Sequence, residues 1–177
     1  MPFSVKGIFY GDLEKIMMGI VTVVLKETGL DHWQPMVRDK FFWLAAVAGV
    51  LVWIVVWLTI VPTFSIQDKS VTILLFTGII YYPVLEEILF RGIIQGWFSK
   101  QSWGKRIFLN LTIANWLTSL LFVVAHFWYQ PVLWAFLVIA PSLVYGFFKD
   151  RYSNIYPSII LHALYNGGFL LVNLMAQ

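Results

Sequence analysis

Long runs of apolar residues alternate with short polar segments along this chain. The clearest run covers residues 41–61, with 21 residues and no charge, and Pro62 ends it. The other apolar runs cover residues 71–98, 107–134, a following stretch that reaches Phe148, and 155–175. Because about 20 apolar residues cross a bilayer as a helix, the pattern predicts an all-α transmembrane bundle of about five spans over residues 41–177.

The first 40 residues follow a different pattern, which changes from polar to amphipathic. Only ten uncharged residues lie between Lys15 and Lys26, too few to cross a bilayer. We therefore expect residues 1–40 to form a separate N-terminal segment that lies along the membrane interface or beside the bundle. His32 falls in this segment, and we expect it at the surface.

The basic residues between the apolar runs predict how the chain is oriented. Ten of the 12 Lys and Arg residues fall in three segments that five spans would place on one side. These segments are residues 1–40, the loop 99–106 and the loop 149–151. The other side carries only Lys69. Since cytoplasmic loops are enriched in Lys and Arg, we expect a cytoplasmic N terminus, in the inner (plasma) membrane of a prokaryote.

The composition strengthens the membrane interpretation. Of 177 residues, 60% are hydrophobic and 12% are charged, which is unlike a soluble domain or a disordered chain. The net charge of +3 is explained by the orientation of the spans, so we expect no nucleic-acid partner. The absence of cysteine excludes disulfides, thiolate nucleophiles and cysteine-ligated zinc.

Three charged residues nevertheless lie inside the second apolar run: Glu86, Glu87 and Arg91. Intramembrane charges are costly and often mark function. Glu87 and Arg91 are four residues apart on one helical face and can form an ion pair. The alternative to a functional role for this pair is a helix contact without chemistry. Glu86 points about 100° away from that face, so the sequence predicts a second carboxylate outside the pair.

Two further polar groups lie in later runs. His126 follows an apolar stretch, and Phe122, one helical turn earlier, could support its ring. His162 and Asn166 are four residues apart in the last run, so they could hydrogen-bond to each other or point to a common site. The alternatives are an interfacial histidine and a helix–helix hydrogen bond.

Taken together, these groups form a set suited to hydrolysis. Glutamate and histidine can activate water as a general base, and a second histidine with an amide can stabilise an oxyanion. Serine catalysis is disfavoured, because Ser119 and Ser142 lack a GxSxG motif. A carboxylate with two histidines could also hold a metal, although the chain has no HExxH motif.

The depth of these residues in the bilayer restricts where the third span can begin. If that span began at Ile107, His126 would lie near the outer surface, too far from His162. We therefore expect residues 99–111 to lie along the inner interface and the third helix to begin near Thr112. The catalytic groups should then converge around a polar cavity that opens to one side.

Three motifs occur in order, each within an apolar run: Glu86-Glu87-Ile88-Leu89-Phe90-Arg91, Phe122-x-x-x-His126 and His162-x-x-x-Asn166. In this respect residues 71–175 resemble the CAAX protease and bacteriocin-processing family of intramembrane glutamic endopeptidases, also called the Abi family. The resemblance implies that Glu87 and Arg91 support the site as an ion pair, and that residues 71–175 form the protease core.

The same resemblance implies the catalytic roles. Glu86 and His126 match the pair that activates the attacking water, and His162 and Asn166 match the oxyanion hole. The family mechanism implies no metal and no cofactor.

The implied partner is a membrane-anchored protein or peptide precursor, in keeping with compact relatives that process C-terminal sorting signals or bacteriocins. Two alternatives stay open: a non-catalytic scaffold or bacteriocin-immunity protein on the same fold, and a metal-dependent membrane hydrolase.

Overall fold

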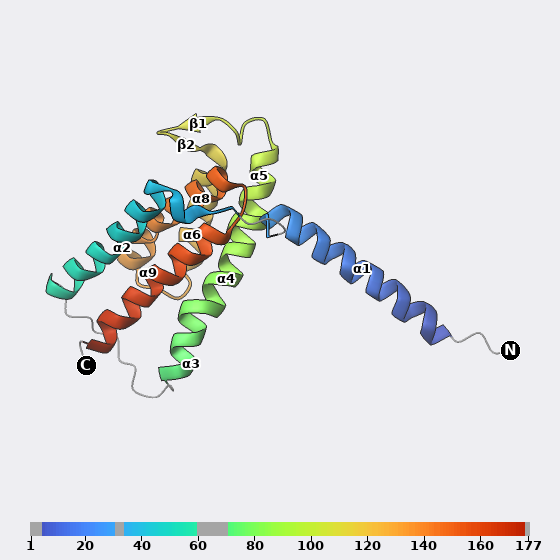
Figure 1. The fold of residues 1–177 in the computed structure, drawn as a ribbon, viewed down its shortest axis with the longest axis horizontal. Helices are drawn as coiled ribbons and strands as arrows, with labels where there is room; N and C mark the ends of the chain where they lie inside the picture. Colours follow the sequence, from blue (N-terminus) through green and yellow to red (C-terminus); the bar gives the residue numbers. More distant parts are fainter. Residues whose placement is uncertain (1–4, 31–33, 60–70, 176–177) are drawn as a thin grey trace.

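A computed structural model describes residues 5–30, 34–59 and 71–175 of the chain. In these ranges the protein is an all-α bundle with one small β-hairpin, as Figure 1 shows. The predicted end of the first span at Pro62, the loop residue Lys69 and the surface position of His32 lie outside the described residues.

The helices follow one another in the order of the apolar runs. The N-terminal part contains α1 (Val5–Thr28), the short 3-10 helix η1 (Met36–Arg38) and α2 (Lys40–Thr59). One long helix then consists of α3 (Val71–Leu75), the π-helical η2 (Phe76–Tyr81), α4 (Tyr82–Glu87), the π-helical η3 (Ile88–Gln95) and α5 (Gly96–Lys100). The remaining elements are β1 (Ile107–Phe108), β2 (Leu111–Thr112), α6 (Ile113–His126), α7 (Val132–Leu137), α8 (Ile139–Tyr152) and α9 (Tyr156–Met175).

Four helical segments are long and apolar enough to cross a membrane. They are Lys40–Thr59, Val71–Lys100, Val132–Tyr152 and Tyr156–Met175. The fifth apolar helix, α6, has 14 residues, or about 21 Å at the α-helical rise. Four of the expected spans thus have full length, and the remaining one is a short helix within the bundle.

The start of α6 confirms the predicted boundary near Thr112. The Thr112 hydroxyl caps the helix by accepting the Asn115 backbone N–H at 3.0 Å. The residues before it form the β1–β2 hairpin, whose turn places Leu109 and Asn110 at φ +49° and +62°. The chain therefore turns at the end of the bundle before α6 enters it.

The predicted loop at residues 149–151 is wrong, because α8 continues through these residues to Tyr152. Two effects stabilise the extra turn. Lys149 and Arg151 lie in the last turn, where positive charge interacts favourably with the helix dipole. The Asp150 carboxylate accepts hydrogen bonds from two other elements, Gln95 of η3 and Thr112 of β2.

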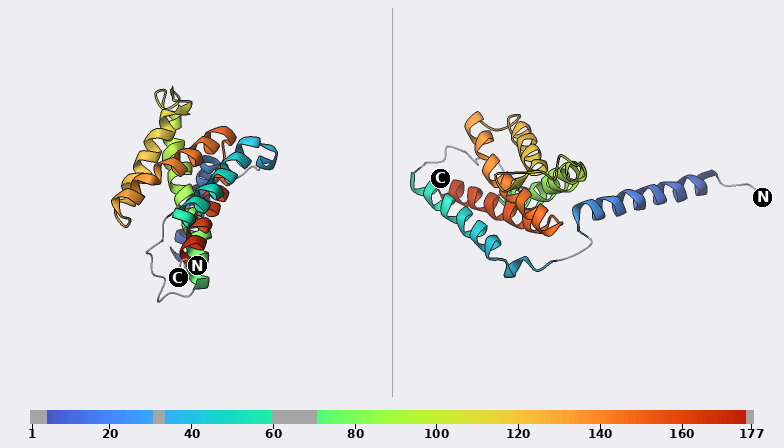
Figure 2. Two further views of the ribbon diagram at one scale, coloured as in Figure 1. Left: turned by 90° about the vertical axis from the view of Figure 1, so that its left-hand side faces the viewer. Right: turned by 90° about the horizontal axis from the view of Figure 1, so that it is seen from above.

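Helix α1 projects away from the bundle, as Figure 1 and the right-hand view of Figure 2 show. Its last residue, Thr28, is held at the bundle, because its carbonyl accepts the Ile155 N–H at 3.0 Å. Gly92 of η3 allows this contact, since a Cβ at Gly92 would lie 2.4 Å from the Thr28 methyl group. The interfacial position expected for residues 1–40 stays a prediction.

The packing core lies where α2, α8 and α9 meet. Its buried side chains include Phe42, Tyr145, Phe148 and Leu161. A close approach between α2 and α9 occurs at Gly49, where a Cβ would lie 2.1 Å from the Tyr165 ring. Small residues at such crossings allow helices in membranes to pack tightly. This core holds α9, and with it the second histidine, against the rest of the bundle.

Candidate active site

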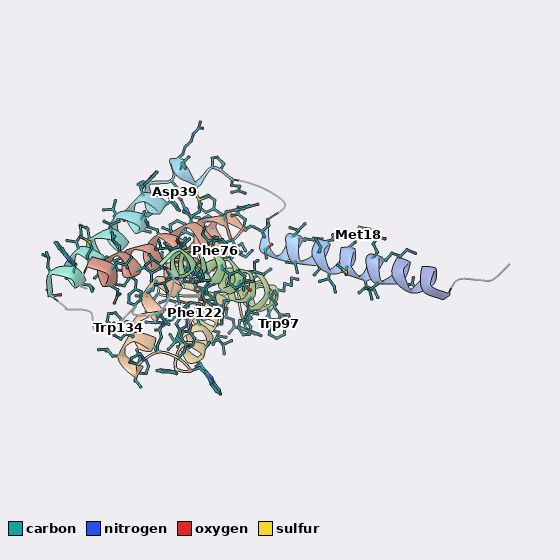
Figure 3. The ribbon with its side chains drawn as sticks, turned by 90° about the horizontal axis from the view of Figure 1, so that it is seen from below. Met18, Asp39, Phe76, Trp97, Phe122 and Trp134 are labelled. Carbon is teal, nitrogen blue, oxygen red and sulfur yellow. The ribbon has the colours of Figure 1, made fainter. Side chains whose placement is uncertain are left out.

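The residues singled out in the sequence come from four helical segments, α4, η3, α6 and α9, which pack together in the bundle. Glu86 and Glu87 lie in α4, Phe122 and His126 in α6, and His162 in α9. Figure 3 labels Phe122 among the helices of the bundle, far from Met18 on the projecting α1.

A buried ionic cluster joins α4, η3 and α9. Arg91 Nε lies 3.3 Å from Glu87 Oε2, and both side chains are fully buried. The other carboxylate oxygen of Glu87 lies 2.8 Å from His162 Nδ1. The predicted ion pair is therefore confirmed, and it extends to the histidine of the last helix. The contact with a carboxylate places a hydrogen on Nδ1 and so fixes the orientation of the imidazole.

Glu86 has a different environment from its neighbour. Its side chain is 25% exposed, whereas that of Glu87 is fully buried. Glu86 Oε2 lies 3.7 Å from His162 Nε2, on the opposite side of the ring from Glu87. The two adjacent carboxylates thus contact the two nitrogens of one imidazole, and Glu86 is the one with an exposed part.

His126 lies beside the same aromatic ring as His162. The Phe122 ring centroid is 4.3 Å from that of His126 and 6.0 Å from that of His162. His126 Nδ1 lies 2.8 Å from the Phe122 carbonyl oxygen. Because a carbonyl only accepts, this nitrogen carries the hydrogen, so the neutral ring has Nε2 as its acceptor. The predicted contact between Phe122 and His126 is confirmed.

Asn166 lies one turn beyond His162 on α9. Its amide nitrogen donates to the Gly78 carbonyl of η2 at 2.9 Å. The structure thus gives Asn166 the helix–helix hydrogen bond that was one of the two alternatives, and the bond ties α9 to the start of the glutamate helix. The amide nitrogen has a second hydrogen, which this bond does not use.

The uncharged partners of Arg91 were not recognised from the sequence. Its guanidinium donates to Ser142 Oγ at 2.6 Å, and more weakly to Gln95 and Ser119 at 3.4 and 3.5 Å. Gln95 is four residues from Arg91, so helical spacing could have indicated it. The serines belong to α8 and α6 and were considered only as nucleophiles. They are instead hydrogen-bond acceptors for a buried cation.

Tyr145 was also missed. Its ring stacks on that of His162, with centroids 4.8 Å apart and an interplanar angle of 17°. Tyr145 and Ser142 are three residues apart in α8 and therefore share a face, so two polar groups on one face of an apolar run were the available signal. Through these two residues, α8 contacts both Arg91 and His162.

The polar network continues from the cluster to the end of the bundle. Gln95 Nε2 donates to the Gly146 carbonyl at 2.9 Å and to Asp150 Oδ1 at 2.8 Å. The other oxygen of Asp150 accepts the Thr112 hydroxyl at 2.6 Å. Buried polar groups need such partners, since each unsatisfied group is costly. The network fixes η3 against α8 and thereby fixes Arg91.

Tyr129 lies in the loop after α6, where its ring centroid is 5.1 Å from that of His126. Burial and the nearby charge of Glu86 both raise the pKa of Tyr129. The phenol therefore stays protonated and can donate a hydrogen bond at the edge of the site.

The donor arrangement bears on the metal alternative. Across residues 5–30, 34–59 and 71–175, no group of three or more His, Asp or Glu side chains is arranged to hold a metal ion. Glu86 Oε2 and His162 Nε2 lie 3.7 Å apart. The other nitrogen of His162 contacts Glu87, and Nδ1 of His126 contacts a carbonyl.

Comparison with known proteins identifies one family. The model of the family described as type II CAAX prenyl endopeptidase Rce1-like matches residues 68–168, more than half of the chain. This range contains both glutamates, Arg91, both histidines of the site and Asn166. The searches of curated proteins and of solved structures give no match.

Proposed function

Because the chain belongs to the Rce1-like family of type II CAAX prenyl endopeptidases, we propose that it is an intramembrane endopeptidase that uses Glu86 to activate water. The family and the four apolar helices make it a CAAX-type protease and an integral membrane protein. The glutamic mechanism, the substrate and the orientation are our proposals.

The exposure of Glu86 supports this assignment best. A general base must be reached by water and must be free to accept a proton. Glu86 is 25% exposed and lies 3.7 Å from His162, whereas Glu87 is fully buried and neutralises Arg91. Of two neighbouring carboxylates, one is thus suited to chemistry and the other to holding the site together.

The reaction follows from these positions. Glu86, aided by Nε2 of His126, takes a proton from water as the oxygen attacks the scissile carbonyl carbon. The free N–H of Asn166 donates to the oxyanion that forms, and His162 donates from Nε2 when its ring carries a hydrogen on both nitrogens. The proton then passes to the leaving amine as the C–N bond breaks, which regenerates the carboxylate and releases a new carboxyl terminus and a new amino terminus.

We propose as substrate a membrane-anchored protein or peptide precursor, with C-terminal sorting signals as one class. The site lies between apolar helices, so a substrate with its own apolar segment would reach it from the bilayer. We place the enzyme in the inner membrane of a prokaryote, with its N terminus in the cytoplasm, because of the distribution of Lys and Arg.

The test compares protein termini in membranes of cells that carry the wild-type gene, Glu86→Gln or Glu14→Gln. Glu14 is exposed on α1, so its replacement by Gln makes the same chemical change outside the site. Mass spectrometry of newly formed termini should find a set present with wild type and Glu14→Gln, and absent with Glu86→Gln. A set that is unchanged by Glu86→Gln would reject the glutamic mechanism.

Further variants and a chelator, used in the same cells, separate the other hypotheses. A scaffold or immunity protein would keep its full biological effect in folded Glu86→Gln and His126→Ala variants. A metal-dependent hydrolase would lose cleavage with a chelator and regain it with added metal, whereas the proposed mechanism is insensitive to both.

A further inference from the structure

A second polar site lies at the end of the bundle, outside the catalytic cluster. A surface pocket of about 410 Å³ is lined by residues from the end of η1, the start of α2 and the end of α8, among them Arg38, Lys40 and Arg151. Figure 1 places the start of α2 at the same end of the bundle as the β1–β2 hairpin, and Figure 3 labels Asp39 at its outer edge.

The pocket carries an excess of positive charge. Three cations line it, against the single carboxylate of Asp39. Asp39 Oδ2 accepts Arg151 Nε at 2.5 Å, so this acid neutralises one of the three. In the described part of the chain, neither Arg38 nor Lys40 forms an ion pair with a carboxylate. A net charge of about two is therefore directed into the pocket.

Asp39 is fully used as a structural acceptor. Besides Arg151 it accepts the Tyr152 hydroxyl at 2.7 Å and the Phe41 backbone N–H at 2.9 Å. Burial acts to raise the pKa of Asp39, but the hydrogen bonds from Tyr152, Phe41 and Arg151 outweigh it and lower that pKa. The carboxylate thus holds Arg151 at the pocket and does not compete for the other cations.

An apolar surface begins directly below the pocket. Phe41, Trp43 and Leu44, at the start of α2, are 44–65% exposed. The Phe41 ring lies 5.2 Å from the Arg151 guanidinium carbon and 5.4 Å from Lys40 Nζ. From this point α2 continues as an exposed apolar helix without charge to Thr59. A ligand that fits both parts has an anionic head and long apolar chains.

We propose that this pocket binds the headgroup of an anionic phospholipid, whose acyl chains lie along the exposed face of α2. Basic pockets beside membrane helices on the cytoplasmic side bind acidic headgroups in this way. A free phosphate would satisfy the cations but would not use the apolar surface. The proposal does not depend on the proposed protease activity.

The test measures lipid binding by the purified full-length protein in detergent, by native mass spectrometry. Phosphatidylglycerol and phosphatidylcholine with identical acyl chains are compared, with inorganic phosphate as a competitor. The double variant Arg38→Gln/Lys40→Gln removes two exposed charges of the pocket. Its matched control is Lys105→Gln/Arg106→Gln, which removes two exposed charges beside the hairpin.

We expect phosphatidylglycerol to bind more tightly than phosphatidylcholine. The pocket variant should weaken phosphatidylglycerol binding by about fivefold for each charge removed, equivalent to about 1 kcal/mol per charge, and the hairpin variant should leave it unchanged. Lys40→Gln alone should reduce the binding free energy of phosphatidylglycerol by about half as much as the double pocket variant.

Three results would overturn the proposal. Equal binding of the two lipids would remove the requirement for an anionic headgroup. Equal losses of phosphatidylglycerol affinity in the pocket and hairpin variants would mean that general surface charge, and not a specific site, binds the lipid. Displacement of the lipid by millimolar inorganic phosphate would assign the pocket to a free anion.

Discussion

Replacing Glu87 by Gln should cost much more stability than the same change at Glu86. The substitution keeps size and removes one negative charge. At position 87 it leaves the guanidinium of Arg91 in a fully buried position without its 3.3 Å partner and weakens the contact with His162. At position 86 it affects a side chain that is partly exposed to water.

The expected magnitudes follow from this difference in burial. Removing one member of a buried ion pair costs about 3–5 kcal/mol, because the other charge is left uncompensated. An ion pair near water contributes about 0–1 kcal/mol, and Glu86 lies 3.7 Å from His162 with a quarter of its side chain exposed. Glu86→Gln should therefore abolish cleavage with little loss of stability. Glu87→Gln should have a much lower free energy of unfolding than Glu86→Gln.

The measurement is the free energy of unfolding in mixed micelles, by titration with a denaturing detergent and helical circular dichroism. A third variant, Arg91→Met, and the double variant Glu87→Gln/Arg91→Met complete a cycle. Since the double variant leaves no buried charge unpaired, its cost should be well below the sum of the two single costs. The coupling would report the ion pair itself.

Equal unfolding free energies for Glu86→Gln and Glu87→Gln would refute the reasoning, because the two carboxylates would then share one role. Additive costs in the cycle would refute it as well, since they would mean that Glu87 and Arg91 do not interact. Retention of cleavage in Glu86→Gln together with its loss in a folded Glu87→Gln would exchange the assigned roles.

Three further predictions use matched pairs or a change of pH. Ser142→Ala removes a hydrogen-bond acceptor from a buried cation and should lower the free energy of unfolding by about 1.5–3 kcal/mol. Ser158 donates to a backbone carbonyl, so Ser158→Ala should cost about 1 kcal/mol. Titration with a denaturing detergent measures both costs, and equal values would contradict the network around Arg91. Gly49→Ala places a Cβ 2.1 Å from the Tyr165 ring and should lower the thermal midpoint of unfolding. Gly19→Ala places its Cβ in open space and should leave the midpoint unchanged. A lower midpoint in both variants would contradict the close crossing of α2 and α9. Hydrogen bonds lower the pKa of Asp39, so the stabilising effect of its carboxylate is present above about pH 4 and disappears as the pH falls through the lowered pKa. The thermal midpoints of wild type and Asp39→Asn should therefore differ at pH 7 and converge in acid. A difference that stays constant with pH would contradict this assignment.

The fold was predictable where one physical requirement dominates. Long uncharged runs must be helical in a membrane, and α2 and α9 begin within one residue of the predicted runs. The start of α6 followed from the need to bring His126 to the depth of His162. The helical turn at residues 149–151 was not predictable from local charge, because its Asp150 is satisfied by residues far away in the sequence.

The site was predictable only as far as helical spacing reaches. The pair Glu87–Arg91 is separated by one turn, so the sequence alone indicates it. Ser142 and Ser119 contact Arg91 only because α6, α8 and η3 pack together. An isolated serine in an apolar run carries no signal of its partner, since a hydroxyl can also bond to the preceding turn of its own helix.

The two glutamates and His162 together explain why adjacent acids can have different roles in one helix. Successive residues on a helix point about 100° apart, so Glu87 faces the packed interior with Arg91 while Glu86 faces the partly exposed side. The imidazole of His162 lies between them and contacts both. We therefore expect a change that disturbs Arg91 or its partner Ser142 on α8 to act on Glu86 through the orientation of this ring. The polar network that ends at Asp150 and Thr112 is thus connected, through Arg91, Glu87 and His162, to a carboxylate that it does not contact.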